Sequence, residues 1–407
     1  MYDLTVAMEW LEFAVRWLHV ITAIAWIGSS FFFIALDLGL NRNIAGPADG
    51  EEWQVHGGGF YHIQKYLIAP DEMPEHLIWH KWQSYWTWIS GFFLLFLVYY
   101  LGADLYLVDP SVADISTLTA VALSLASLAL GWIAYDLLCK SKLAENPTML
   151  MVLLFGVLVG MSYFYTSVFS GRAALLHLGA FTATIMSANV FFIIMPNQRV
   201  VVADLKAGRK PDPKYGKIAK LRSTHNNYLT LPVIFMMLSN HYPLAFATEY
   251  NWIIASLVFL MGVTIRHYFN SKHARTGNPT WTWIVTVVLF IIVAWLSTAP
   301  QYNSAATETA EIITPRQQAL IETAGFEDMA TIVQGRCAMC HAAEPAWDGI
   351  LWAPKGVILE THQQIAQHAK TIYIQSAISH AMPPANVSMI TNEERAQIAN
   401  WWRSTQQ

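Results

Sequence analysis

Three residues near the C-terminal end of the sequence have the types and spacing needed for covalent haem chemistry. Cys337, Cys340 and His341 form the pattern C-x-x-C-H within "GRCAMCHAAEPAWDG". In this pattern two thiols bond to a c-type haem and the adjacent imidazole binds its iron. Such a haem accepts and donates electrons one at a time. The pattern therefore predicts that residues 323–407 form an electron-transfer domain that carries haem c.

A methionine downstream offers the second axial ligand. Met382 stands in "AISHAMPPANV", and a thioether on the far side of the iron would raise the haem potential. Met389 and His380 are the alternative ligands. Thr391 and Glu394 have the spacing of a capping box, which predicts a closing helix. Together these features resemble a small class I cytochrome c.

Two histidines in apolar stretches suggest a second haem. His19 and His177 each follow a leucine, in "LHVITAIAWIGSSFFFI" and "LHLGAFTATIMSANVFFII". Ionisable residues inside membrane spans are costly and are therefore functional candidates. Two imidazoles on facing helices could hold a b-type haem in line with the tail haem. The alternative is that each histidine hydrogen-bonds across helices or lies at the lipid headgroups.

Several polar residues lie at the ends of other apolar stretches. Such a set suits a planar anion that carries several N–H and C=O groups. The alternative is a positively charged loop without a ligand, and the nearby "HGGGFYHIQK" adds only a weak signal because it lacks the strand–helix setting of a phosphate loop. The members are Arg222, His225, Asn226 and Asn227 in "LRSTHNNYLTLP", Arg266, and His80.

These residues need apolar elements to position them, and the composition supplies many. Apolar residues make up 55% of the chain and charged residues 13%, whereas soluble domains carry about 25% charged residues. The net charge of −4 and the lack of a basic face argue against nucleic-acid binding. A membrane-spanning helix needs about 20 apolar residues. We predict eight such helices, at about residues 11–36, 78–101, 117–139, 148–169, 173–196, 228–247, 251–270 and 281–300.

The predicted fold class is all-α. Residues 1–302 form the eight-helix domain, 303–322 a linker and 323–407 the cytochrome c domain. The longest loops are predicted at 37–77 and 197–227. The similarity of the first and fifth spans predicts two four-helix repeats.

The distribution of lysine and arginine predicts the orientation. They gather in the odd-numbered loops, and the loop after the fifth span alone runs from Arg199 to Arg222 with eight of them. Positively charged loops stay in the cytoplasm. Both termini and the haem domain are therefore predicted in the periplasm, with the bundle in the lipid of a bacterial inner membrane.

Taken together, the chain resembles the bacterial membrane-bound urate oxidases, also called urate hydroxylases, which join an eight-span domain to a C-terminal cytochrome c. The matching stretches span the whole chain. They are "RWLHVITAIAWIGSSFFFI", "VHGGGFYHIQKYLIAP", "IMSANVFFIIMPNQR", "RSTHNNYLTLPVIFMMLSNHYP" and "CAMCH". The resemblance implies oxidation of urate to 5-hydroxyisourate, with electrons passed to the haem and on to a periplasmic cytochrome or terminal oxidase.

Urate is an anion near neutral pH, so the predicted polar residues acquire roles. Arg222 and Arg266 would bind its charge, and Asn226 and Asn227 would read the ring edges. Either His225 or His80 would be the general base, for which histidine is the usual choice. The main alternative function is a quinol-oxidising or electron-transfer subunit without urate chemistry. A third is a transporter with a haem sensor tail.

Overall fold

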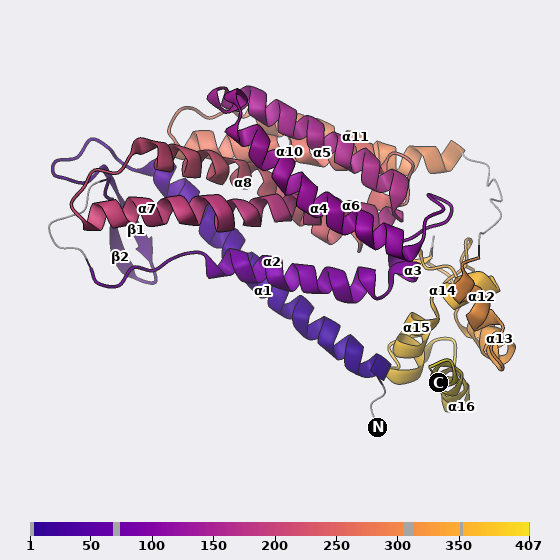
Figure 1. The fold of residues 1–407 in the computed structure, drawn as a ribbon. Coiled ribbons are helices and arrows are strands. Elements are labelled where there is room, and N and C mark those ends of the chain that lie inside the picture. Colours follow the sequence, from indigo (N-terminus) through magenta and orange to yellow (C-terminus); the bar gives the residue numbers. More distant parts are fainter. Residues whose placement is uncertain (1–3, 68–73, 304–312, 351–352, 407) are drawn as a thin grey trace.

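The computed structural model describes residues 4–67, 74–303, 313–350 and 353–406. It consists of a long helical bundle, from α1 to α11, and a smaller helical body, from α12 to α16, at one end of it (Figure 1). We call the smaller body the tail domain and that end of the bundle the tail end. Both termini lie at the tail end (Figure 1). The opposite end carries a two-stranded sheet and is called the hairpin end.

Within the described residues, six helical stretches are long and apolar enough to cross a membrane, judged by length and composition. Their lysines, arginines and carboxylates stand mainly toward the ends. The chain is therefore mostly helical and consistent with a membrane protein. The six are α1 (Leu4–Gly39), α4 (Thr117–Lys140), Pro147–Thr166 of α5 (Pro147–Val168), the continuous helix Gly171–Lys206, α10 (Asn251–His273), and Trp281–Thr298 of α11 (Trp281–Asn303).

Two of the eight predicted spans are helical without meeting that criterion. The first is α2 (Trp82–Leu94), which continues as the π-helix η1 (Leu95–Tyr100). The second is α8 (Pro213–Ser239), whose start was predicted wrongly at 228. It begins earlier because Asp212 caps it, accepting a hydrogen bond from the backbone N–H of Lys214 at 2.9 Å, and because proline at the first helical position fits a helix start.

The predicted loop at 197–227 is therefore short. The helix that starts as α6 (Gly171–Ala188) passes through the π-helix η3 (Asn189–Ile194) into α7 (Met195–Lys206). Only residues 207–212 separate it from α8. Three short helices complete the bundle: α3 (Ala103–Tyr106), η2 (Lys142–Glu145) and α9 (Pro243–Phe246).

The predicted loop at 37–77 contains a β-hairpin, while the other described elements are helical and consistent with an all-α membrane protein. Strands β1 (Gly50–His56) and β2 (Gly59–Lys65) pair antiparallel, with His56 opposite Gly59. The backbone φ angles of Gly57 and Gly58 are +59° and +80°. Two successive positive φ angles are what a tight hairpin turn requires. The glycine triplet therefore forms a turn.

Glycines allow close helix contacts inside the bundle. A Cβ atom added to Gly131 of α4 would stand 2.0 Å from the Phe181 ring of α6, and one added to Gly262 of α10 would stand 2.5 Å from the Pro232 ring of α8. In lipid the hydrophobic effect does not drive helices together. Small residues at such crossings let the helices approach closely and associate through packing contacts instead.

We expect Gly131→Ala to destabilise the bundle by about 1–3 kcal/mol, the usual cost of overpacking. The added methyl group would displace Phe181, which is buried. Gly156→Ala in α5 is the matched control, because a Cβ there meets nothing within 4 Å. Thermal unfolding in detergent should separate the two variants. Equal melting temperatures would contradict the packing argument.

The tail domain has its own core of apolar side chains. Trp401 and Trp402 of the closing helix α16 (Asn392–Ser404) pack on Phe326 and Tyr373. Thr391 and Glu394 form the predicted capping box of this helix. The other elements are α12 (Pro315–Ile321), α13 (Phe326–Arg336), η4 (Pro354–Gly356), α14 (His362–Gln367), α15 (Ala369–Ile372), η5 (Tyr373–Ile378) and η6 (Pro384–Asn386).

Helix α12 lies within the segment predicted as a linker, and its Leu320 belongs to the tail core. Part of the predicted linker, residues 304–312, lies outside the described residues.

Candidate functional site

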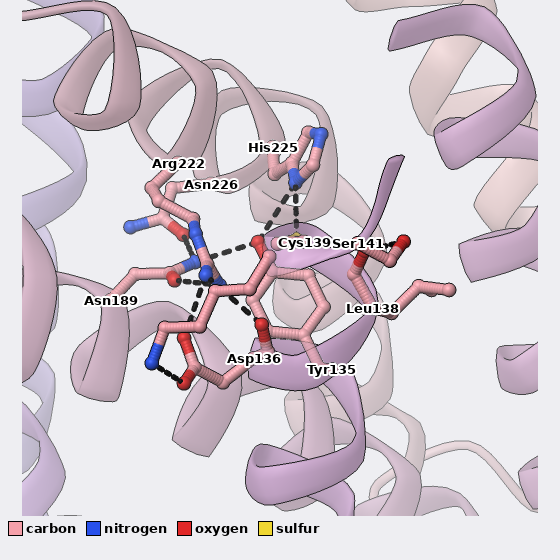
Figure 2. Close-up of polar contacts among 10 residues, drawn as sticks. Tyr135, Asp136, Leu138, Cys139, Ser141, Asn189, Arg222, His225 and Asn226 are labelled. Carbon is pink, nitrogen blue, oxygen red and sulfur yellow. Dashed lines mark hydrogen bonds and ion pairs between the residues drawn. The ribbon is translucent and has the colours of Figure 1, made fainter. Parts of the chain in front are cut away.

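A buried ion pair joins α4 to α8 toward the hairpin end of the bundle. The Arg222 guanidinium donates to the Asp136 carboxylate at 2.6 Å and to Asn189 Oδ1 at 3.2 Å (Figure 2). The Arg222 side chain is only 2% exposed. Asp136 also pairs with Lys140 at 2.5 Å. An anion that reached Arg222 would therefore have to compete with a carboxylate already in place.

Asparagines extend this network to a third helix. Asn189 donates to Asn226 Oδ1 at 2.9 Å and to the Tyr135 hydroxyl oxygen at 3.0 Å. Asn226 donates in turn to the carbonyl of Met186 at 2.9 Å. Figure 2 shows these side chains converging between the helices. Because every link joins two different elements, the network braces α4, α6 with its continuation η3, and α8 against one another.

His225 stands at the edge of the network. Its Nδ1 lies 2.8 Å from the Tyr135 hydroxyl and 4.0 Å from the Cys139 sulfur. The Tyr135 oxygen already accepts from Asn189, so the tyrosine proton is available to His225 Nδ1. That pattern assigns the ring proton to Nε2. Nε2 is buried and has no hydrogen-bond partner, so it faces its surroundings as a donor.

Asn227 and Arg266 belong to a second, separate cluster. Arg266 Nε and Asn270 Nδ2 both donate to Asn227 Oδ1, at 3.3 and 2.9 Å. The Arg266 guanidinium also lies over the Phe31 ring, 4.2 Å from its centroid. Asn227 Nδ2 is buried without a partner. This cluster therefore retains an unused donor and an arginine for which no carboxylate stands within 4 Å among the described residues.

The second cluster adjoins a cavity of about 770 Å³ at the hairpin end. This volume lies within the range typical of small-molecule pockets. Asn227, Asn270 and Tyr228 line it together with four lysines, Lys65, Lys210, Lys217 and Lys220. Two of these lysines, Lys65 and Lys220, pair with Asp37. The cavity can therefore attract anions from the hairpin side.

His80 joins neither cluster. It is exposed, and its ring packs on Phe33 of α1 at a centroid distance of 4.8 Å. The structure thus divides the six predicted catalytic residues among three places. Arg222, His225 and Asn226 share one network, Asn227 and Arg266 share another, and His80 stands apart.

His19 and His177 do not meet. His19 Nδ1 donates to the Thr87 carbonyl at 3.0 Å, beside Gly91 of α2. The His177 ring instead lies 5.7 Å from that of Tyr99 in η1. From Gly91 to Tyr99 the chain climbs about 12 Å at 1.5 Å per helical residue.

The two imidazoles therefore pack against different stretches of α2 and η1, and their joint ligation of a haem b stays a prediction. Their tautomers alone would allow ligation, because His177 Nδ1 donates to the Ala173 carbonyl and leaves a bare, unpartnered Nε2.

The tail motif fits a covalent haem. Cys337 is the C-cap of α13, and Cys340 and His341 follow in the turn. His341 Nδ1 donates to the Val357 carbonyl at 2.9 Å, which leaves Nε2 free, as an iron-ligating histidine requires. Burial raises the pKa of the Cys337 thiol to about 11. Among the described residues no group of three or more His, Cys, Asp or Glu side chains could hold a bare metal ion.

The loops around this motif have unusual backbone conformations. Six non-glycine residues in the described chain have positive φ angles, and five of them lie in the tail domain between Lys355 and Met389. Such conformations persist only where the surroundings impose them, and they gather at functional sites. Met382 is held within this region, because Arg395 donates to its carbonyl at 2.9 Å. The five residues are Lys355, His380, Ala385, Asn386 and Met389.

A buried histidine makes the tail domain sensitive to acid. Burial, with smaller contributions from the charges of Arg172 and His341, lowers the pKa of His368 to about 4. An unfolded histidine titrates near 6.5, so below that pH the unfolded chain binds the proton more tightly. The stability that His368 contributes is therefore lost as the pH falls from about 6.5 to 4.

We expect His368→Gln to reduce the change in tail-domain stability between pH 6.5 and 4. Unfolding of the tail domain is followed in the full chain by the absorbance of its haem. His362→Gln is the control, because the His362 side chain is 40% exposed. A slope unchanged by His368→Gln would contradict the assignment.

Sequence reasoning missed four partners in the buried clusters: Tyr135, Asp136, Asn189 and Asn270. One of them carried a usable signal. Asp136 is a carboxylate in the apolar run "GWIAYDLLCK", and an acid inside a span calls for a buried cation. The asparagines gave no comparable signal, because their partners come from helices distant in the sequence.

Comparison with known families gives one match. A family model described as urate oxidase N-terminal matches residues 5–297. The match covers the bundle and ends before the tail domain. No curated protein matches the chain. No solved structure matches it.

Proposed function

Since this chain belongs to the urate oxidase N-terminal family, we propose that its bundle oxidises urate and that its tail domain is a cytochrome c that receives the electrons. The family match over residues 5–297 carries the urate part of the proposal. The tail motif carries the electron-transfer part. Urate must lose two electrons and a c-type haem takes one at a time, so each urate requires two electron transfers from the bundle to the tail domain.

The residues of the tail domain support the haem. Cys337 and Cys340 would form the two thioether bonds, and His341 and Met382 would supply the axial ligands. The hydrogen bond from His341 Nδ1 to Val357 orients the imidazole for this role. When bound, the haem supplies a one-electron acceptor of raised potential. A periplasmic cytochrome or terminal oxidase would then take each electron onward.

The oxidation itself balances without oxygen. The urate monoanion and one water give neutral 5-hydroxyisourate, one proton and two electrons. The water oxygen forms the new C–O bond, and the electrons leave the purine ring. The protein must bind the anion and accept the proton that is released. Histidine is the side chain whose ordinary pKa suits proton acceptance near neutral pH.

Eight membrane crossings remain part of the proposal. Two helical segments, α2 with η1 and α8, would add to the six apolar helices. Both termini lie at one end of the bundle (Figure 1), and an even number of crossings has this consequence. The lysines around the cavity at the hairpin end support a cytoplasmic hairpin end. The tail domain would then lie in the periplasm of a bacterial inner membrane.

The sequence prediction places urate toward the hairpin end. There Arg266 and Asn227 adjoin the 770 Å³ cavity, while Arg222, Asn226 and His225 lie in the brace behind it. This placement faces one difficulty. Helix α1 runs from Glu9, which contacts the tail domain, to Asp37, which lines that cavity. At 1.5 Å per residue the separation is about 40 Å, too far for one electron-transfer step.

Anaerobic titration of the purified full chain with urate tests the proposal. We expect the visible haem bands to change to those of the reduced form with two electrons per urate consumed. Reduction by a quinol but not by urate would instead indicate a respiratory electron-transfer subunit. Reduction by neither would favour a transporter with a sensor tail, and both outcomes would overturn urate oxidation.

A further inference from the structure

The tail domain docks on the tail end of the bundle through defined polar contacts. Lys370 of α15 pairs with Glu9 of α1 at 2.6 Å, and Arg316 of α12 pairs with Asp104 of α3 at 3.0 Å. Trp402 Nε1 donates to the Thr5 hydroxyl at 3.2 Å. Figure 1 shows α15 and α16 beside the first turns of α1.

A cavity of about 690 Å³ lies at this junction. The bundle contributes residues that precede or begin helices, among them Ser170, Arg172 and Asn251. The tail domain contributes Val357 and His368, among others. Pockets between two domains are common binding sites, and this volume is ample for a bicyclic ring system. The cavity exists only when the tail domain is docked.

Arg172 is the unusual residue of this cavity. Its guanidinium is half-buried and donates to the Asn240 carbonyl at 3.1 Å. Within the described residues no carboxylate lies within 4 Å of it, unlike the docking cations Arg316 and Lys370. Arg172 also lines a second junction cavity of about 370 Å³. A planar guanidinium without a carboxylate is well suited to bind an anion.

Two carboxylates, Asp109 and Glu249, also line the cavity. Asp109 accepts hydrogen bonds from the backbone N–H and hydroxyl of Ser111, at 3.0 and 2.6 Å. A hydrogen bond to Glu249 raises the pKa of Tyr250, so that carboxylate too has its own donor. Lys355 adds a second cation from the tail domain. Each cavity carboxylate thus has a neutral donor of its own, and among the described residues neither forms an ion pair with Arg172 or Lys355.

The tail wall of the cavity adjoins the haem motif. Val357, which lines it, accepts the hydrogen bond from His341 Nδ1. Only Val357 would separate a molecule bound against this wall from His341, which would bind the iron of the proposed haem. A molecule bound here would therefore lie beside the haem motif, whereas the cavity at the hairpin end lies about 40 Å from the tail domain.

From these observations we propose that the cavity between the tail domain and the bundle is the urate-binding site, with Arg172 and Lys355 binding the anion beside His368. This inference rests on the proposed function and assigns its substrate a place. His368 adds a hydrogen-bonding imidazole that burial keeps neutral, with its pKa lowered to about 4. At that pKa His368 would serve as a neutral hydrogen-bonding partner of the ring and not as the acceptor of the released proton.

Equilibrium dialysis of radiolabelled urate against the full haem-loaded chain tests the inference. The protein is held fully reduced and anaerobic, so that urate binds without being oxidised. We expect Arg172→Gln to raise the Kd roughly tenfold or more, because a charge-assisted contact is lost. Arg172→Lys, which keeps the charge, should bind with intermediate affinity.

Arg209→Gln is the matched control, an exposed cation away from the junction whose partner is Asp204, and it should bind urate as the unaltered chain does. An unchanged Kd in Arg172→Gln would overturn the inference, as would loss of binding in Arg266→Gln alone. Gel filtration and the haem spectrum check that each variant is folded.

The binding assay also separates this inference from the proposed function. If urate binds through Arg172 but never reduces the haem, the site stands and the oxidase function fails. If urate reduces the haem while Arg172→Gln binds it normally, the oxidase function stands and this site fails.

Discussion

Serine in place of both Cys337 and Cys340 is expected to abolish urate oxidation while leaving the bundle folded. Serine has nearly the shape of cysteine but cannot form the thioether bonds that retain the haem. The bundle has a core of its own, distinct from the core of the tail domain, so its helices should still assemble. Without the one-electron acceptor, bound urate would have no path for its electrons.

Three measurements on this variant are decisive. Membrane insertion and thermal unfolding should match those of the unaltered chain, the haem bands should vanish, and urate consumption should fall to background. Cys139→Ser is the matched control, because that buried thiol lies in α4 beside His225, far from the tail. If the double variant inserts normally and consumes urate at the unaltered rate, electrons do not leave through the tail domain and the proposed coupling is wrong.

Much of the architecture follows from local sequence signals. Long apolar runs predicted α1, α4, α5, α10 and α11 because a membrane span must satisfy its backbone internally. Capping residues set boundaries as well, and Thr391 with Glu394 marked the start of α16 correctly. The early start of α8 was missed because a positively charged stretch was taken for a loop, although Asp212 and Pro213 mark a helix start.

The hairpin was missed for a related reason. Residues 50–65 alternate weakly and carry several charges, and only the two positive-φ glycines determine the turn. The two-glycine signal had been weighed as a ligand-binding loop. In the structure these glycines form the turn that joins β1 to β2.

The candidate site could be predicted only in part, because the sequence shows residue types but not which helices face one another. It singled out Arg222, Asn226 and Asn227 as polar residues suited to bind an anion, and the structure buries all three. It could not show that Asp136 already neutralises Arg222. Nor could it show Arg172 facing a cavity that forms only when residues separated by nearly two hundred positions meet at the junction.

The last large effect concerns the brace, and it distinguishes a structural Arg222 from a substrate-binding one. Asp136→Leu should destabilise the bundle by about 3–5 kcal/mol, because it strands a buried arginine without its carboxylate. Arg222→Met should cost less, since Lys140 can still pair with Asp136. The double variant should recover most of the loss of Asp136→Leu.

Recovery in the double variant would be incomplete, because Asn189 Oδ1 no longer accepts a hydrogen bond from Arg222. A buried acceptor without a hydrogen bond lowers the stability of the fold. Thermal unfolding in detergent measures these differences, and urate dialysis on the double variant completes the test. Unaltered urate affinity would leave Arg222 as a brace that holds α4 and α8 together. A double variant less stable than Asp136→Leu, or one that no longer binds urate, would show instead that the guanidinium serves more than its carboxylate partner.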